Sequence, residues 1–309
     1  MAKAEAEVLC VGEVLWDALP GGLFLGGAPF NVACHLRAAG VPVSMVSRVG
    51  ADRLGDEVLR RAARYGVGVD LIQVDTALPT GFVRVQVDDA GNPGYDILAP
   101  SAWDAIETSE GLLSRAGKAR AIVFGTLAQR DERSRRTIQR LWDASALMVF
   151  DVNLRPPFED EELVRRSLRR ADVVKLSEHE LAQIAKWTGL RGTLQETMTA
   201  VAETFECSVV CVTRGGDGAA LLHDGAFTEH PGFPVEVRDT VGAGDAFLAV
   251  LLAGLLNGTP DEALLKHANL VGAYVVTQFG AVPSDQEAAT APPSPPAPRI
   301  RKRAPRKRT

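Results

Sequence analysis

The chain has 309 residues, of which 46% are hydrophobic and 24% charged, as in an ordinary soluble globular protein. Its length allows one large α/β domain or two small ones. The formal net charge of −5 favours neither nucleic acid nor a membrane as a partner of the whole chain. The last eleven residues depart from this average, because seven are Lys or Arg and none is acidic.

The four cysteines form no CxxC pair and have no histidine at zinc-ligand spacing. We expect free thiols packed as small hydrophobic groups in a reducing compartment. The first residues, MAKAEAEVLCVGE, carry acids where a signal peptide needs an apolar core. The longest apolar run, residues 246–256, is too short to cross a bilayer. We therefore expect a cytoplasmic protein with no membrane partner.

Short apolar segments alternate with amphipathic segments along most of the chain. A helix is expected at residues 28–40, with Pro29 in its first turn and Gly40 at its end, and another at residues 54–66. Buried strands are expected at residues 8–14, 43–50, 121–125, 146–153, 172–176 and 208–216. This alternation predicts an α/β fold: a doubly wound, mostly parallel sheet covered by helices on both faces.

Residues from Val69 to Ala99 break this alternation. Apolar and polar residues alternate there on both sides of the turn DDAGNPG, which predicts an antiparallel hairpin. We expect a small β-sheet lid built from segments near residues 12–25 and 69–102, although a hairpin at the sheet edge without function fits the same pattern.

Residues 1–286 are expected to form one domain. Residues 287–309 are rich in proline and then basic, and they lack the apolar content needed for a core. We expect this tail to be disordered.

The stretch DTVGAGDAF, residues 239–247, places Gly242, Ala243 and Gly244 before Asp245 and an apolar helix. Free backbone N–H groups at such a helix start can bind a phosphoryl group, and a side chain at Gly242 would then occupy the anion site. Asp245 can accept the proton of an attacking hydroxyl beside it. A plain capped turn is the alternative.

The first strand is followed by Glu13 and Asp17, where the carboxyl edge of a sheet would open. The next predicted helix follows Gly27 and carries Asn31. Asp17 and Asn31 can hydrogen-bond the hydroxyls of a polyol, with Gly27 leaving room for the ring. Single Asp and Asn residues are otherwise common in caps and turns.

Three later strand ends also carry polar residues. Arg155 can bind substrate oxygens or form a surface ion pair. Glu180 can hold Mg²⁺ through water, but its spacing from Ser177 fits a helix capping box better. A glycine-rich turn after the last strand is a weak sign of a nucleotide site; its residues are Thr213, Gly215 and Gly218.

The motifs taken together resemble the ribokinase-like, or PfkB, family of carbohydrate kinases, and above all its fructokinase branch. The motifs on which this resemblance rests are GGAPFNVACHLRAAG, RVGADRLGDEVL, DVNLRP, VVKLSEHE, VTRGGDGA and DTVGAGDAF, and the resemblance covers residues 8–284. P-loop, protein-kinase and G-x-S-x-G motifs are missing from the sequence.

The resemblance implies transfer of the ATP γ-phosphoryl group to a sugar hydroxyl with Mg²⁺. It assigns Asp245 as the base and the Gly242–Gly244 turn as the anion site. It places a possible K⁺ beside Asp239, near the segment FGAVPS. The remaining implied contacts are Asp17, Gly27, Asn31 and Arg155 to the sugar, Thr213, Gly215 and Gly218 to the nucleotide, Asn269 near the adenine, and Glu180 to Mg²⁺ through water.

Two departures from the family pattern bear on the substrate and the metal. GGAPFN stands where ribokinases have GGKGAN, which favours fructose, phosphorylated on its 6-hydroxyl, over ribose. Ser177 replaces the Asn of the N-x-x-E motif near the metal. Alternatives are a 2-keto-3-deoxygluconate kinase, another PfkB-type kinase, or an inactive scaffold whose basic tail binds nucleic acid. Some members pair through the lid, so a homodimer is a further option.

Overall fold

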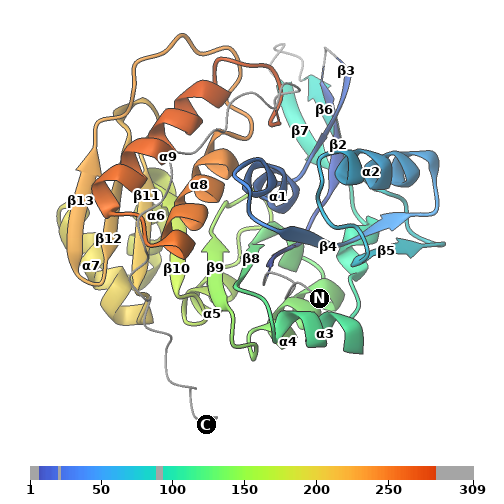
Figure 1. Cartoon of the computed structure of the whole chain (residues 1–309), viewed down its shortest axis with the longest axis horizontal. Helices are drawn as coiled ribbons and strands as arrows, with labels where there is room; N and C mark the ends of the chain where they lie inside the picture. Colours follow the sequence, from blue (N-terminus) through green and yellow to red (C-terminus); the bar gives the residue numbers. More distant parts are fainter. Residues whose placement is uncertain (1–6, 20–21, 88–92, 283–309) are drawn as a thin grey trace.

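We describe a computed structural model of the chain, which places residues 7–19, 22–87 and 93–282 (Figure 1). The predicted tail, residues 287–309, and the proposed domain boundary at residue 286 lie outside these ranges.

A nine-stranded sheet forms the centre of the described structure, in the order β13-β12-β11-β10-β9-β8-β1-β4-β5. Seven neighbouring strands run parallel from β11 to β5. At one edge β12 pairs antiparallel with β11, and β13 pairs antiparallel with β12. Their bounds are β1 Val8–Val11, β4 Val43–Gly50, β5 Ile72–Asp75, β8 Ala121–Gly125, β9 Leu147–Asp151, β10 Val173–Ser177, β11 Val209–Thr213, β12 Ala219–His223 and β13 Ala226–His230. The predicted doubly wound, mostly parallel fold is confirmed.

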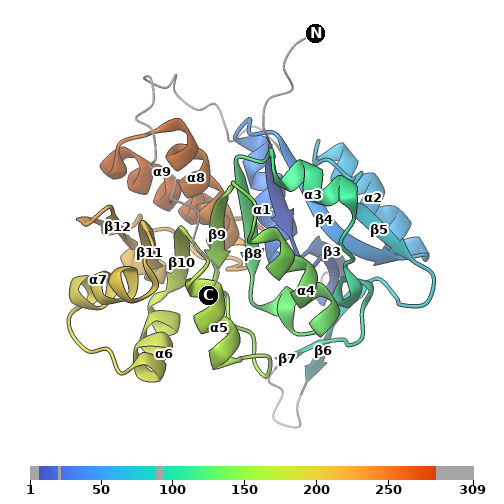
Figure 2. The same cartoon turned by 90° about the horizontal axis from the view of Figure 1, so that it is seen from below.

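Helices cover both faces of this sheet; α8 and α9 lie on one side of it and α5, α6 and α7 on the other (Figure 2). The first face carries α1 Ala28–Ala38, α2 Arg53–Arg64, α8 Ala243–Asn257 and α9 Asp261–Val275. The second carries α3 Glu110–Ala116, α4 Glu132–Leu141, α5 Glu161–Leu168, α6 Glu178–Thr188 and α7 Leu194–Phe205. Short 3₁₀ turns are η1 Ala102–Ala105, η2 Leu127–Gln129 and η3 Gly215–Asp217.

The strands are continuous apolar runs in the sequence because each strand contributes side chains to the hydrophobic cores on both faces of the sheet. In β1, Val8 and Cys10 belong to the core under α1 and α8, whereas Leu9 and Val11 belong to the core under α3 and α4. Burial on both faces is typical of parallel sheets between helices.

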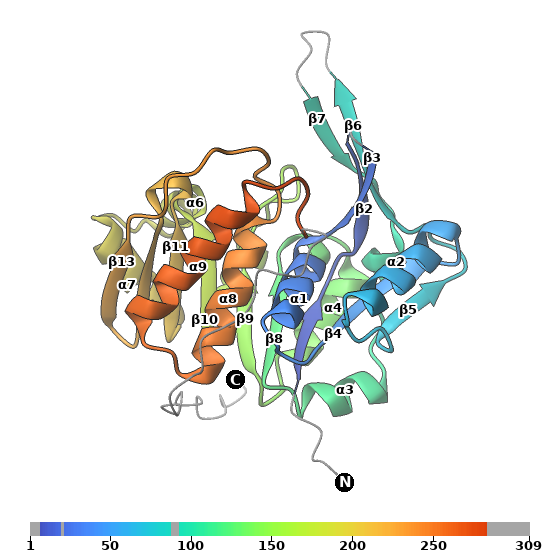
Figure 3. The same cartoon turned by 45° about the horizontal axis from the view of Figure 1, so that its top comes forward.

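A second sheet of four strands projects from the molecule, in the order β3-β2-β6-β7 (Figure 3). Its strands are β2 Leu15–Leu19, β3 Gly22–Gly26, β6 Gly81–Val87 and β7 Pro93–Ile97. The expectation that the lid begins near residue 69 is wrong, because β5 pairs with β4 in the main sheet. Asp17 consequently lies on the small sheet, and not at the carboxyl end of a strand of the main sheet.

Candidate active site

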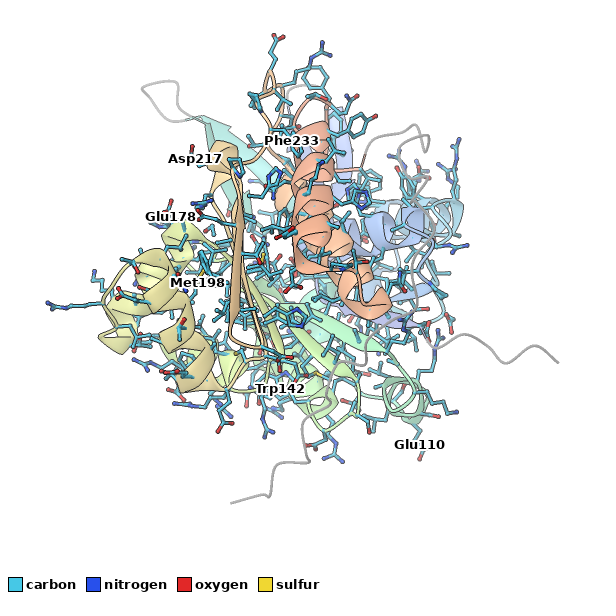
Figure 4. All side chains as sticks on the ribbon, turned by 60° about the vertical axis from the view of Figure 1, so that its left-hand side comes forward. Glu110, Trp142, Glu178, Met198, Asp217 and Phe233 are labelled. Atoms are coloured by element: carbon cyan, nitrogen blue, oxygen red, sulfur yellow. The ribbon has the colours of Figure 1, made fainter. Side chains whose placement is uncertain are left out.

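Polar side chains gather where parallel strands of the main sheet end and where α1 and α8 begin. Figure 4 shows this end toward its top, where Glu178 and Asp217 follow the ends of β10 and β11. Trp142, which precedes β9, lies toward the bottom. Ligands of open α/β sheets bind at the carboxyl ends of the strands.

The start of α8 is shaped by Gly242, whose positive φ of 81° marks the residue before the helix. A Cβ on Gly242 would lie 2.5 Å from both Cα and Cβ of Ala281. The expectation that a side chain here would occupy an anion site is therefore wrong, because that space holds the segment around Ala281. Glycine is required for the close approach of this segment to the helix start.

Asp245 lies in the first turn of α8 and is only 9% exposed. Its Oδ2 accepts a hydrogen bond of 2.7 Å from Nδ2 of Asn31, which is buried on α1. The Oδ1 atom of Asn31 is buried and has no partner among the described residues. Asn31 therefore orients the Asp245 carboxylate and keeps one acceptor free at the same place.

A buried lysine lies against the same helix start. Lys175 on β10 is 6% exposed, and its Nζ lies 3.0 Å from Oδ1 of Asp151 at the end of β9. A Cβ on Gly244 would come within 3.0 Å of this Nζ. Burial raises the pKa of Asp151 to about 6, against the opposing effect of the Lys175 ammonium.

Glu13 follows β1 and is 3% exposed. Burial raises the pKa of its carboxyl to about 7; backbone hydrogen bonds from Glu13 itself and from Ala28 lower it, and the charge of Asp245 raises it. A Cβ on Gly27, whose φ is 109°, would lie 2.5 Å from the Glu13 carbonyl oxygen. Gly27 is thus required by close backbone packing. The sequence analysis had instead predicted that this glycine leaves room for a sugar ring.

The charges of Arg155 and Asp239 both act on Asp17, although the three residues come from separate segments. Burial raises the pKa of Asp17 to about 6, while the charge of Arg155 lowers it and that of Asp239 raises it. The Arg155 Nη1 donates to the Leu154 carbonyl oxygen at 2.9 Å, and its guanidinium forms no salt bridge within the described ranges. An unpaired guanidinium opposite two carboxylates suits recognition of a polar ligand.

Asp239 fixes two loops at this end of the molecule. Its Oδ1 accepts from the backbone N–H of Val241 and its Oδ2 from that of Gly280, both at 3.0 Å. His35 on α1 holds the same segment through a contact of 2.9 Å between Nε2 and the Ala281 carbonyl oxygen. The segment before residue 283 is therefore tied to α1, to the start of α8 and to Asp239.

Glu180 forms the capping box of α6 that the spacing indicates. Its Oε2 accepts from the backbone N–H of Ser177 at 2.7 Å, and Ser177 Oγ accepts in return from the N–H of Glu180. Its Oε1 accepts from the Leu154 N–H at 2.7 Å. This carboxylate therefore joins α6 to the loop that carries Arg155.

The comparison with known proteins decides the family. A model of the pfkB family of carbohydrate kinases matches residues 19–288. The chain belongs to this family. This pfkB kinase is 31% identical to the fructokinase of Escherichia coli over 298 residues, which cover 90% of the chain and 95% of the relative. It is a phosphotransferase that acts on a sugar hydroxyl.

Solved structures agree with this assignment. A double mutant of fructokinase from Vibrio cholerae O395, in a form with fructose, ADP and potassium ion bound, has a TM-score of 0.76 at 25% identity. That match covers 91% of this kinase and 96% of that chain. Aminoimidazole riboside kinase from Salmonella enterica, complexed with aminoimidazole riboside and an ATP analog, has a TM-score of 0.73 at 25% identity, over 89% and 95% of the chains.

The glycine-rich turn of the pfkB kinase follows β11, as its sequence indicates. Thr213 ends the strand and Gly215 opens η3, where a Cβ would meet no atom within 4 Å. Gly218, with a φ of 81°, packs so closely on the His230 carbonyl oxygen that no side chain fits. Asn269 is buried on α9, and its Nδ2 donates to the Leu265 carbonyl oxygen at 2.7 Å. Its amide nitrogen is therefore already engaged within the helix.

Two features are absent from the described ranges. Among these residues, no three side chains of His, Cys, Asp or Glu are grouped so as to hold a metal ion. The helices formed by the same residues include none that is long and apolar enough to cross a membrane.

Sequence reasoning missed Lys175 and the contact between Asn31 and Asp245. The signal for the lysine was a charged residue inside the apolar run VVKL, whose other members are buried. The contact carried no local signal, because 214 residues separate its partners.

Proposed function

We propose that this pfkB kinase transfers the γ-phosphoryl group of ATP to the 6-hydroxyl of fructose. The observation that carries the proposal is the buried Asp245 in the first turn of α8, oriented by Asn31. The fructokinase relatives and the GGAPFN sequence favour fructose over other sugars.

In the proposed reaction, the 6-hydroxyl oxygen forms a bond to the γ-phosphorus as the bond to the β-phosphate oxygen of ATP breaks. The hydroxyl proton passes to the Asp245 carboxylate, and ADP leaves with the bonding electron pair. The Gly242–Gly244 turn presents backbone N–H groups and the positive end of α8 to the transferring group. Asn31 holds Asp245 toward the attacking hydroxyl.

The sugar site is proposed at the small sheet and the start of α1. Asp17 and the free Oδ1 of Asn31 accept hydrogen bonds from sugar hydroxyls, and Arg155 donates to sugar oxygens. Gly27 shapes this site by holding α1 close to Glu13. The nucleotide is proposed at the turn after β11, with contacts from Thr213, Gly215 and Gly218 and with Asn269 near the adenine.

Two cations are part of the proposal. Mg²⁺ usually retains several waters in proteins, and Glu180 can hold one of them with the lone pairs that its backbone donors leave free. Mg²⁺ would offset charge on the ATP phosphates. K⁺ is proposed beside Asp239, since the carboxylate and the neighbouring loop carbonyls are oxygen ligands. The relative from Vibrio cholerae with potassium ion supports this.

A 2-keto-3-deoxygluconate kinase or another PfkB-type kinase remains the second candidate. Arg155 is compatible with it, because a guanidinium suits a substrate carboxylate as well as a sugar hydroxyl. A scaffold that binds nucleic acid through its basic tail is less well supported, because a scaffold would not need Asp245 and its oriented amide partner. We further infer a cytoplasmic protein, since the four described cysteines are buried thiols that form no disulfide. Pairing of two copies through the small sheet stays a prediction.

The test of the substrate is a coupled ADP-release assay with ATP, Mg²⁺ and a panel of fructose, ribose, glucose, 2-keto-3-deoxygluconate and adenosine. We expect saturable turnover and the highest kcat/KM with fructose. Higher kcat/KM with 2-keto-3-deoxygluconate would replace fructose by the second candidate. No turnover with any compound of the panel, measured on folded protein that binds ATP, would contradict the proposal.

A further inference from the structure

The position of Lys175 is unusual for a lysine that only stabilises the fold. Its ammonium is nearly fully buried and lies against Gly244, in the first turn of α8. A helix start already carries a partial positive charge, so cations are normally found at the other end of a helix. Burial of an ammonium is costly unless other groups stabilise its charge.

Carboxylates from three different elements face this ammonium. Asp151 on β9 pairs with it at 3.0 Å, and Asp245 on α8 and Glu180 on α6 act on it through their charges. Burial lowers the pKa of Lys175, but these carboxylates outweigh burial and raise it above its ordinary value. Lys175 therefore stays charged. The Cys211 thiol on β11 also faces the ammonium, and burial raises its pKa to about 12.

Asp245 has two further titratable neighbours. Glu13 faces it from the loop after β1, and His35 faces it from α1. Burial lowers the pKa of His35, so its ring is neutral near neutral pH. The charged groups near Asp245 are consequently one ammonium, that of Lys175, and the carboxyl groups of Asp151, Glu180 and Glu13. A phosphoryl group arriving here brings still more negative charge.

We propose that Lys175 is a positioning residue for phosphoryl transfer. Its ammonium offsets the negative charge beneath the start of α8 as the phosphoryl group arrives. The lysine acts through Asp245 and Gly244, and the inference rests on the proposed role of Asp245 as the base. Gly244 belongs to the same arrangement, since a side chain there would press on the ammonium.

The test must separate this role from a structural ion pair. Lys175→Met alone would leave Asp151 buried and unpaired, and the variant could fail to fold for that reason. We therefore compare Asp151→Asn with the double variant Asp151→Asn/Lys175→Met. These two proteins differ only in the ammonium. Arg115→Met serves as a control, because it breaks an ion pair with Glu7 on the far side of the sheet.

We measure kcat and the KM values for the sugar and for ATP, with the melting temperature of each variant. Relative to Asp151→Asn, the double variant should lose about tenfold or more in kcat, while KM for the sugar stays within about threefold. The KM for ATP should likewise stay within about threefold, because the ammonium lies against the start of α8 and not against the proposed nucleotide turn. Arg115→Met should lower only the melting temperature.

Equal kcat in the two Asp151 variants would overturn the inference. A fall in kcat together with a comparable rise in the KM for the sugar would also overturn it, since a lysine that only supports the fold would disturb binding and turnover alike. Failure of the proposed function looks different: Asp245→Asn would then turn over like the unsubstituted protein.

Discussion

Asp245 acquires its proposed chemistry from neighbours that are distant in sequence. The stretch DTVGAGDAF was enough to predict an acid at a helix start, because a glycine turn followed by an apolar run is a local pattern. The amide of Asn31 and the ammonium of Lys175 reach the same place from other elements. Folding of the sheet creates these contacts, so residue spacing could not predict them.

Arg155 offers a test of the sugar site at this scale. Arg155→Met should raise KM for the sugar about tenfold to a hundredfold, because hydrogen bonds from a charged donor to the substrate are lost. The melting temperature should stay unchanged, since this guanidinium forms no salt bridge with the described residues. Steady-state kinetics and thermal melts check both points.

Arg136→Met is the matched control, because Arg136 forms an exposed ion pair with Glu132 on α4. It should change neither quantity. An unchanged sugar KM in Arg155→Met would remove Arg155 from the proposed sugar site.

At the scale of elements, strands buried on both faces were the most predictable part of the fold. The expected strands at residues 43–50 and 121–125 match β4 and β8, because continuous apolar runs between helices have few other interpretations. The segment of β5 was misassigned to the lid, since its exposure varies along the strand as in an edge hairpin. The antiparallel strands β12 and β13 were not predicted.

Glycines at the ends of helices and strands allow close packing of the backbone, and the sequence alone does not show which segment packs there. Gly242→Ala should destabilise the kinase by about 1–3 kcal/mol, because the added methyl group meets Ala281 and the backbone has a positive φ. The measurement is denaturant unfolding of the full chain.

Gly117→Ala is the control, because a Cβ there would meet its nearest neighbour at an ordinary 3.6 Å. This change should be close to neutral. Equal stability of Gly242→Ala and the unsubstituted chain would show that the segment around Ala281 does not pack on the helix start.

At the scale of the whole molecule, the fold gathers carboxyl groups at one end of the sheet and removes them from water. Burial raises the pKa of Glu13 to about 7 and that of Asp17 and Asp151 to about 6. Such an arrangement costs stability when the groups are ionised, which is expected of a site built to bind a polar ligand.

The stability of the free kinase should therefore fall as pH rises. The Glu13 carboxyl releases its proton near its ordinary value of 4.5 in the unfolded chain and near 7 in the folded one. Between these values the folded state holds more protons, so the free energy of unfolding decreases with rising pH. Glu13→Gln cannot titrate, and its melting temperature should decline less between pH 5 and pH 8. Parallel curves for both proteins would contradict the burial of an ionisable Glu13.

The variant Asp245→Asn tests most directly whether Asp245 is the base of this sugar kinase. With ATP, Mg²⁺ and fructose, we expect kcat to fall by about a hundredfold or more, while the melting temperature and KM for the sugar stay close to those of the unsubstituted protein. Asparagine retains the shape of the side chain but cannot take the proton. Turnover near the original rate, from a well-folded variant, would contradict the account.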